Sequence, residues 1–220
     1  MNEIFPGLFV GDLESVNKDS ISRHEITHIV SICEDMLLKG LDWKELGIPT
    51  SHRLHFDVQD RAQVLIFPLF DPVTRWIDKV LQNSEHKVLV HCHAGRSRSV
   101  ALVAAFLIRF WSRITHGYDP SLDTILALIK QKRPTINPNA GFRRQLKQYE
   151  VRQRKRRQQA AALSVKKERQ RFLRDTIEHY LPSPRQICSG IVLSYIGKRE
   201  KGSDEGPVKD SDVPALDTEQ

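Results

Sequence analysis

Residues 91–99, His-Cys-His-Ala-Gly-Arg-Ser-Arg-Ser, place a thiol and a guanidinium at a spacing that suits chemistry on a bound oxyanion. An apolar stretch at 87–90 precedes them and another from 100 to 111 follows, which predicts a strand, a tight turn and a helix. Backbone N–H groups of such a turn and of a helix N-terminus converge on one point and bind anions. Cys92 would lie under the oxyanion and Arg98 beside it.

Each residue type in this stretch has a role in that chemistry. Only the thiolate form of a cysteine attacks, and the helix N-terminus and Arg98 both favour a negative charge on Cys92. The planar guanidinium of Arg98 can bind two phosphate oxygens at once, which an ammonium group cannot do. Gly95 allows a turn that a Cβ would crowd, and Ser99 can donate a hydrogen bond that helps the sulfur leave. A structural cysteine beside a surface arginine would leave the glycine, the serines and the strand-to-helix context unexplained.

The pattern Cys-x5-Arg between a strand and a helix resembles the motif of the protein tyrosine phosphatase superfamily. His-Cys-x-Ala-Gly-x-Ser-Arg-Ser is similar to its dual-specificity branch, in particular to the small atypical members that lack a kinase-docking domain. The resemblance covers about residues 4–150, because 4–11 are similar to the opening strand of the family and 137–142 to the start of its last catalytic-domain helix. It implies an α/β fold with a central mixed sheet flanked by helices.

The resemblance also implies a function, which is the hydrolysis of phosphoserine, phosphothreonine and phosphotyrosine in proteins through a phosphocysteine intermediate. Phosphoproteins are then the expected partners. The loop that would bind the phosphate group consists of six residues, His93, Ala94, Gly95, Arg96, Ser97 and Arg98.

Such a reaction needs a general acid that protonates the leaving oxygen. Apolar and polar residues alternate over 54–58, as in a half-buried strand, and Asp57 falls on its polar face. Asp60 follows in a predicted loop, where a group that approaches a substrate belongs. Its distance along the chain from Cys92 is typical of the family. We therefore expect Asp60 to be the acid, with Asp57 as the alternative.

The implied mechanism has two steps and no metal or other cofactor. Cys92 attacks phosphorus while Asp60 protonates the departing oxygen, and Asp60 then activates the water that hydrolyses the phosphocysteine. Arg98 and the loop amides supply the positive field that a metal would otherwise provide. His91, Cys92 and His93 are consecutive and cannot converge on one zinc ion, so we expect His91 to orient the loop instead.

Two other functions stay open at this point. His93 and Arg96 occupy variable positions of the motif, and their basic character would favour acidic substrates such as phosphoinositides, unless both simply face solvent. Phosphoinositide and RNA 5′-phosphatases, however, typically carry lysine-rich or threonine-glycine loops here. A catalytically idle phosphobinding or scaffold protein is the other alternative. Such proteins usually lack one of Asp60, Cys92 and Arg98, and all three are present.

Cys33 is a candidate redox partner of the nucleophile. It ends a predicted strand and precedes Glu34, and this pair is similar to the strand-ending Cys-Glu of the regenerating-liver phosphatases. That resemblance implies a disulfide between Cys33 and Cys92, which would protect the nucleophile from over-oxidation. The alternative is that Cys33 is a small buried hydrophobic residue.

Alternating strands and helices are predicted for the first part of the chain. Strands are expected near 4–10, 27–32, 52–58 and 87–91, and helices near 66–83, 98–113, 121–132 and from 138 onward. Asp119-Pro120 and Asn137-Pro138 each predict a capping residue followed by proline at the first helical position. The helix at 98–113 is apolar nearly all round and should be the buried central one.

Length and charge divide the chain of 220 residues into three parts. Residues 1–150 suffice for one catalytic domain, 151–181 should form a basic helical extension, and 182–220 a tail that is largely disordered from about 197. Residues 151–174 contain ten Lys/Arg against Glu168 as the one acid, in a chain of net charge +7. The extension is a solvated helix, a patch for nuclear import or nucleic-acid binding, or a contact with anionic membrane lipid. The oligomeric state stays open.

The compartment is the last expectation. The chain has three cysteines, an odd number of which one is assigned to catalysis, so we expect a reducing environment in the cytoplasm or the nucleus. The longest apolar run, 100–108, is too short to span a bilayer, and no signal peptide opens the chain. Asn2 follows Met1, so the glycine that myristoylation requires is missing.

Overall fold

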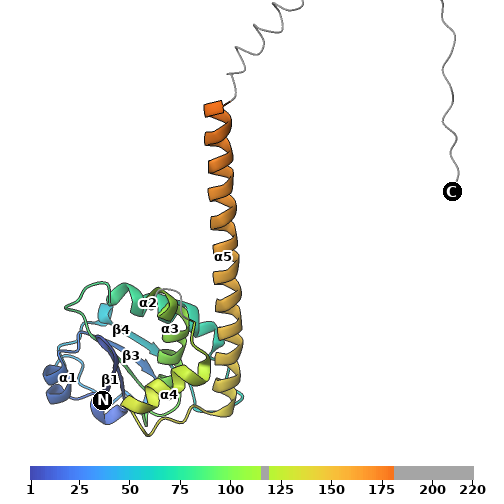
Figure 1. Ribbon diagram of the computed structural model, residues 1–220. Coiled ribbons are helices and arrows are strands. Elements are labelled where there is room, and N and C mark those ends of the chain that lie inside the picture. The colour runs from blue at the N-terminus through green and yellow to red at the C-terminus, as the bar shows by residue number, and fades with distance from the viewer. Residues whose placement is uncertain (115–118, 181–220) are drawn as a thin grey trace, which may run out of the picture. The chain divides into compact units, whose positions relative to one another are not determined.

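A computed structural model describes residues 1–114 and 119–180, in which five strands form one sheet of order β1-β2-β5-β3-β4 (Figure 1). The strands are β1 (Asn2–Phe5), β2 (Leu8–Gly11), β3 (His28–Ile32), β4 (Arg53–Phe56) and β5 (Val88–His91). β1 is antiparallel to β2, whereas β2, β5, β3 and β4 run parallel to their neighbours. The predicted α/β fold with a mixed central sheet is therefore confirmed.

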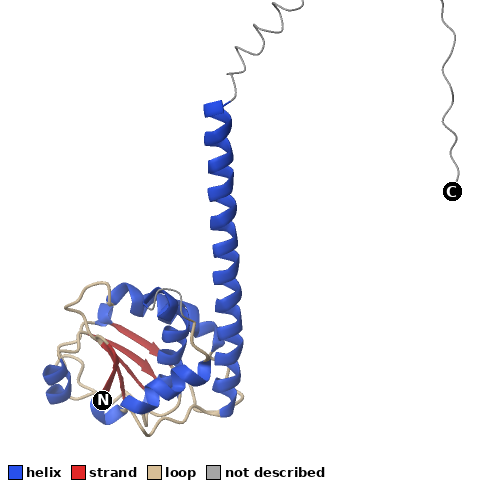
Figure 2. Ribbon diagram, viewed as in Figure 1, coloured by secondary structure: helices blue, strands red, loops and turns tan. Residues whose placement is uncertain are grey.

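Helices cover both faces of the sheet (Figure 2). They are α1 (Lys18–His24), α2 (Phe67–Val80), α3 (Arg98–Ile114), α4 (Leu122–Lys132) and α5 (Ala140–Tyr180). The prediction missed α1, because its seven residues are mostly polar and show no apolar periodicity. A capping bond marks its start, since Asn17 Oδ1 accepts from Ser20 N at 2.9 Å.

The first predicted strand, 4–10, is wrong as a single element. It is a hairpin of β1 and β2, in which Phe5 pairs with Leu8. Gly7 takes a φ of +73°, which an L-residue rarely adopts, so Pro6-Gly7 turns the chain. The strand predicted at 52–58 is also shorter, because β4 ends at Phe56.

Both predicted helix caps are wrong by two residues. Ser121, not Asp119, caps α4 through a bond from Thr124 N to Ser121 Oγ of 3.1 Å. Asn139, not Asn137, caps α5, since Phe142 N donates to Asn139 Oδ1 at 2.9 Å. In both cases the proline precedes the capping residue, and the polar side chain after it satisfies the free N–H groups of the first turn.

The larger core lies between the sheet and the helices α2, α3, α4 and the start of α5. Residues 100–108 of α3 are at most 3% exposed, so α3 is the buried central helix, as predicted. On the opposite face a smaller cluster packs Ile21 of α1 against Phe9, Ile29 and Leu89 of the sheet. No helix within the described residues is long and apolar enough to cross a membrane.

Residues Met1–Ala161 and Ala162–Gln220 form two compact units, and α5 contributes to both. The basic segment 151–174 lies within this helix. The predicted boundaries at 150 and 181 stay predictions. The tail predicted for 182–220 lies outside the described residues.

Asp71 of α2 holds the start of α5 in the first unit. It accepts a hydrogen bond from the Tyr149 hydroxyl at 2.9 Å and forms ion pairs with Arg109, Arg152 and Arg156 at 2.5, 2.7 and 3.2 Å. Burial alone would raise the pKa of Asp71, but the Tyr149 hydroxyl, Arg152 and Arg156 hold it below its usual value. One carboxylate thus joins α2, α3 and α5.

Three histidines meet at the amino ends of β3 and β4. The ring of His28 stacks on that of His52 at 4.1 Å between centroids and lies 4.8 Å from that of His86. Burial, together with repulsion from the other two rings, lowers the pKa of His28 to about 4.

Burial likewise lowers the pKa of His91 at the end of β5 to about 4. Both imidazoles are therefore neutral at pH 7.

We expect acid to destabilise the fold through these two histidines. The unfolded chain protonates them near pH 6.5 and the folded chain only near pH 4, so the free energy of unfolding falls as the pH drops through this window. His28→Phe keeps an aromatic ring and removes one of the two titrating imidazoles. The decrease in the free energy of unfolding between pH 7 and 4.5 should therefore be smaller in this variant by about 1–3 kcal/mol. Urea unfolding at both pH values measures it. An unchanged pH dependence in the variant would contradict this assignment.

Candidate active site

The 92–98 loop connects β5 to α3 and closely approaches the backbone of β2. Gly95 takes a φ of +61°, and a Cβ there would clash with Arg133 and lie 2.5 Å from Gly11 O. Arg133 is buried and donates to Gly95 O at 2.7 Å, to Asn2 Oδ1 at 2.8 Å and to Asp12 Oδ2 at 3.0 Å. Only glycine fits at position 95, and the loop is tied to the first strands of the chain.

The structure buries Cys92 at the carboxyl end of β5, where it is 1% exposed. Its Sγ lies 3.3 Å from Oγ of the buried Ser99 in the first turn of α3. Before it, His91 Nε2 forms a 2.7 Å hydrogen bond with Ser31 Oγ of the neighbouring strand β3. These contacts join the cysteine to the helix that follows it and to the strand beside it, which suits the orienting role expected of His91.

Arg98 is 4% exposed and is oriented by groups from two loops. Its Nη1 donates to Glu34 Oε2 at 2.5 Å and to Val58 O at 2.7 Å. Burial would raise the pKa of Glu34, but the hydrogen bond from Arg98 lowers it. Nε of Arg98 has no hydrogen-bond partner among the described residues and lies 4.0 Å from Asp60 Oδ2. A buried N–H donor is thus left for a bound anion.

Asp60 is hydrogen-bonded to the loop, and Asp57 is not. Oδ1 of Asp60 accepts from Ser97 Oγ and from Asn139 Nδ2, both at 2.7 Å. Asn139 N in turn donates to Ser97 Oγ at 3.1 Å. Asp57 is exposed, and no hydrogen bond between it and the 92–98 loop occurs in the described part of the chain.

The loop of Asp60 also contacts the start of α5. A Cβ on Gly141 would collide with the carbonyl oxygen of Ala62, so the helix and this loop touch through their backbones. Sequence reasoning did not assign Glu34, Asn139 or Arg133 to the site. Glu34 follows Cys33 directly, and Asn139 lies within 137–142, the stretch that is similar to the start of the family's last helix. No sequence signal marks Arg133.

The remaining loop residues form the mouth of the site. His93 and Ala94 line a hollow of about 390 Å³ together with Asp12, Leu13 and Glu14. Arg96 is exposed, and its Nε donates to Thr135 O at 3.0 Å. The mouth therefore combines His93 with two carboxylates.

Cys33 lies next to the nucleophile strand. It follows β3, which pairs with β5 so that Ser31 is opposite His91. Both Cys33 and Cys92 are free thiols in the structure. Burial raises the pKa of Cys33 to about 11, so it is protonated at pH 7. The disulfide between Cys33 and Cys92 stays a prediction.

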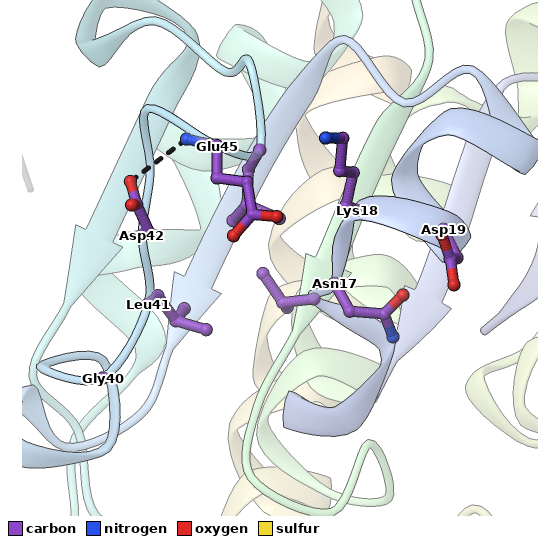
Figure 3. Close-up of a pocket in the computed structure, with 9 residues that line it drawn as sticks. Asn17, Lys18, Asp19, Gly40, Leu41, Asp42 and Glu45 are labelled. Carbon is purple, nitrogen blue, oxygen red and sulfur yellow. Dashed lines mark hydrogen bonds between the residues drawn. The ribbon is translucent and has the colours of Figure 1, made fainter.

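A second hollow, of about 430 Å³, is separate from this site (Figure 3). It lies beside the start of α1 and is lined by polar residues that include Asn17, Lys18, Asp19, Asp42 and Glu45. No residue of the 92–98 loop lines it. Within the described residues, no group of three His, Cys, Asp or Glu side chains is placed to hold a metal ion.

Comparison with known families gives one match, the dual specificity phosphatase catalytic domain, over residues 8–152. Among curated proteins, a probable dual specificity protein phosphatase of Dictyostelium discoideum is 32% identical over 69% of this chain and 34% of its own. The serine/threonine/tyrosine-interacting protein of Homo sapiens is 35% identical over 69% of this chain and 65% of its own. Dual specificity protein phosphatase 15 of Mus musculus is 32% identical over 68% of this chain and 57% of its own. The chain thus spans about a third to two thirds of these relatives.

Solved structures agree with these matches. The human tyrosine phosphatase-like serine/threonine/tyrosine-interacting protein superposes with a TM-score of 0.58 at 32% identity, covering 69% of this chain and 95% of that one. DUSP15 superposes with a TM-score of 0.57 at 32% identity, and the match covers 71% of this chain and 92% of DUSP15.

We expect Gly95→Ala to unfold the loop, because the new Cβ meets Arg133 and the Gly11 backbone in a left-handed conformation. The expected loss of unfolding free energy is about 2–4 kcal/mol, together with loss of orthovanadate binding. Two matched variants separate the causes. Gly47→Ala has the positive φ but no atom within 4 Å of the new Cβ, and it should cost about 1 kcal/mol. Gly40→Ala has neither a positive φ nor a close neighbour and should cost little. Equal stability of all three variants would contradict the close approach.

Proposed function

The chain belongs to the dual specificity phosphatase family of the protein tyrosine phosphatase superfamily, and from this premise we propose that it hydrolyses phosphoserine, phosphothreonine and phosphotyrosine in proteins through a phosphocysteine intermediate. The observation that carries the proposal is the assembly around one loop of a cysteine, an arginine and a carboxylate. Ser99 lies 3.3 Å from the sulfur of Cys92, Arg98 is buried beside the loop, and Asp60 is hydrogen-bonded to it.

In the first step, the phosphate group of the substrate is bound by the N–H groups of the loop and the N-terminus of α3. Arg98 donates to its oxygens, and Glu34 holds the guanidinium through Nη1 at 2.5 Å while Nε stays available. The thiolate of Cys92 attacks phosphorus, and the bond from phosphorus to the leaving oxygen breaks. The buried guanidinium stabilises the charge that develops on the phosphoryl oxygens.

Asp60 supplies the proton in that step. Its Oδ1 already accepts two hydrogen bonds, from Ser97 and Asn139, which leaves Oδ2, 4.0 Å from Arg98 Nε, as the oxygen that transfers the proton. Oδ2 gives this proton to the departing serine, threonine or tyrosine oxygen. In the second step Oδ2 of Asp60 takes a proton from a water molecule. The resulting hydroxide attacks phosphorus, and the bond between phosphorus and Sγ of Cys92 breaks. Ser99 donates a hydrogen bond to the departing sulfur.

Protein substrates fit the mouth of the site better than multiply charged lipids or RNA ends. Asp12 and Glu14 line the hollow beside His93. The Asp12 carboxylate is paired with Arg133, so the carboxylate of Glu14 is the one that repels further phosphates next to the bound one. Arg96 is not among the residues that line this hollow, and its Nε donates to Thr135 O at 3.0 Å. We also propose the cytoplasm or the nucleus as the location, where phosphoproteins and free thiols coexist.

Substitutions of the nucleophile and the arginine test the reaction. Cys92→Ser should abolish turnover of a phosphotyrosine peptide but still bind it, because the loop amides remain. Arg98→Lys should lose about 10²-fold or more in kcat/KM, since an ammonium group cannot bind two oxygens in a plane. Cys33→Ser, the matched change of a second buried thiol, should keep the initial rate. Turnover by Cys92→Ser would contradict the assignment of Cys92 as the nucleophile, whereas no turnover by the unaltered chain would favour an idle phosphobinding protein.

A second set of variants tests the acid. Asp60→Asn should reduce kcat for a phosphoserine peptide by about 10²-fold and have less effect on an aryl phosphate with a good leaving group, while Asp57→Asn should change little. Asn139→Ala should show the same dependence on the leaving group at about 3–30-fold. Asn139→Ser can still cap α5 but has no Nδ2, so it should keep stability and lose activity like Asn139→Ala. A larger effect of Asp57→Asn would show that Asp57 is the acid.

A further inference from the structure

The two acceptors that hold Nη1 of Arg98, Glu34 Oε2 and Val58 O, come from segments that leave neighbouring strands. Glu34 follows β3 and Val58 follows β4, and the pairing of these strands ends with Ile32 opposite Phe56. Both acceptors therefore lie past the last pair of residues that the sheet fixes. The orientation of the guanidinium depends on how these two acceptors are held relative to each other.

His55 joins the two segments at the point where the strand pairing ends. Its Nε2 donates to the carbonyl oxygen of Cys33 at 3.0 Å, because a carbonyl can only accept. Its Nδ1 lies 3.3 Å from Oδ1 of Asp35, which is an ion pair when the imidazole is protonated. Cys33 and Asp35 are the two chain neighbours of Glu34. One side chain of β4 thus contacts the residues on both sides of the one that binds Arg98.

We propose that His55 is a positioning residue for Arg98, an inference that deepens the proposed phosphatase reaction and rests on it. His55 fixes Glu34 relative to Val58, and these two groups bind Nη1 of the arginine. Nε of Arg98, which has no hydrogen-bond partner among the described residues, is then directed toward the phosphate. A guanidinium oriented before the substrate binds needs little reorganisation while charge develops on the phosphoryl oxygens.

The place of His55 distinguishes this role from a contribution to stability alone. Its side chain is 33% exposed and borders a hollow of about 490 Å³, so it belongs to neither hydrophobic core. At the other end of β4, Nδ1 of His52 donates to Thr27 O at 3.2 Å and likewise joins the chain around β4 to that around β3. Of these two histidines, His55 is the one that contacts the neighbours of Glu34, so His52 provides a matched control.

Kinetics of the full chain with a phosphotyrosine peptide test the proposal. His55→Leu removes both contacts and should lower kcat/KM about 3–30-fold under conditions in which the variant is folded. His55→Gln keeps an amide nitrogen that can donate to Cys33 O and should restore most of this loss. His52→Leu should keep the kcat/KM of the unaltered chain.

The leaving group separates this role from that of the acid. Arg98 binds the phosphate group, whereas Asp60 protonates the leaving oxygen. The loss in His55→Leu should therefore be the same for a phosphoserine peptide and for an aryl phosphate with a good leaving group.

Binding of orthovanadate gives a readout that needs no turnover. His55→Leu should weaken it about 3–30-fold. Arg98→Ala should weaken it further, and adding His55→Leu to Arg98→Ala should cause no additional loss, because His55 acts through the guanidinium. Arg98→Lys, which keeps a cation beside Glu34, replaces the alanine variant in this cycle should the latter not fold.

Two results would overturn the proposal. Equal losses of activity in His55→Leu and His52→Leu would show that a link between β3 and β4 is all that matters. Additive effects of His55→Leu and Arg98→Ala on orthovanadate binding would show that His55 does not act through Arg98. An unaltered chain that shows the expected pattern of orthovanadate binding but hydrolyses no phosphopeptide would instead contradict the proposed reaction and support the positioning of Arg98 by His55.

Discussion

The geometry of the site depends on the close approach between the 92–98 loop and the first two strands. Gly95 brings its backbone against Gly11, and the buried guanidinium of Arg133 bonds the loop carbonyl, Asn2 and Asp12 at once. A buried arginine is tolerated only when its donors are paired, and three acceptors meet this requirement here. The loop amides point where they do because these contacts leave the backbone no alternative.

The two reactive groups besides Cys92, which are Arg98 and Asp60, are not oriented by the 92–98 loop alone. Arg98 is held by Glu34 and by Val58 O, and Asp60 by Ser97 and Asn139. In each case the support uses one atom of the reactive group, Nη1 of the arginine or Oδ1 of the carboxylate, and leaves the other side for the substrate. Positioning groups of this kind lower the cost of ordering the site during reaction.

The long helix α5 belongs to the catalytic unit at its start. Its first turns complete the catalytic unit, since Asn139 reaches Asp60 and Tyr149 reaches Asp71. There the arginines are matched by carboxylates and the helix is part of the core. Beyond Ala161, all of residues 162–174 are exposed.

The sequence by itself determined the elements whose information is local. The strand, turn and helix around 91–99 follow from apolar runs on both sides of a glycine-containing loop, and the alternation at 54–58 separated Asp57 from Asp60. Pro6-Gly7 carried a local turn signal that the prediction of a single strand overlooked, and the polar helix α1 gave no periodic signal. Only the tertiary structure decided that Glu34 meets Arg98, Asn139 meets Asp60 and Arg133 meets Gly95. These partners are far apart along the chain, and their meeting depends on how the sheet orders its strands and on where α5 begins, which no local pattern of residues encodes.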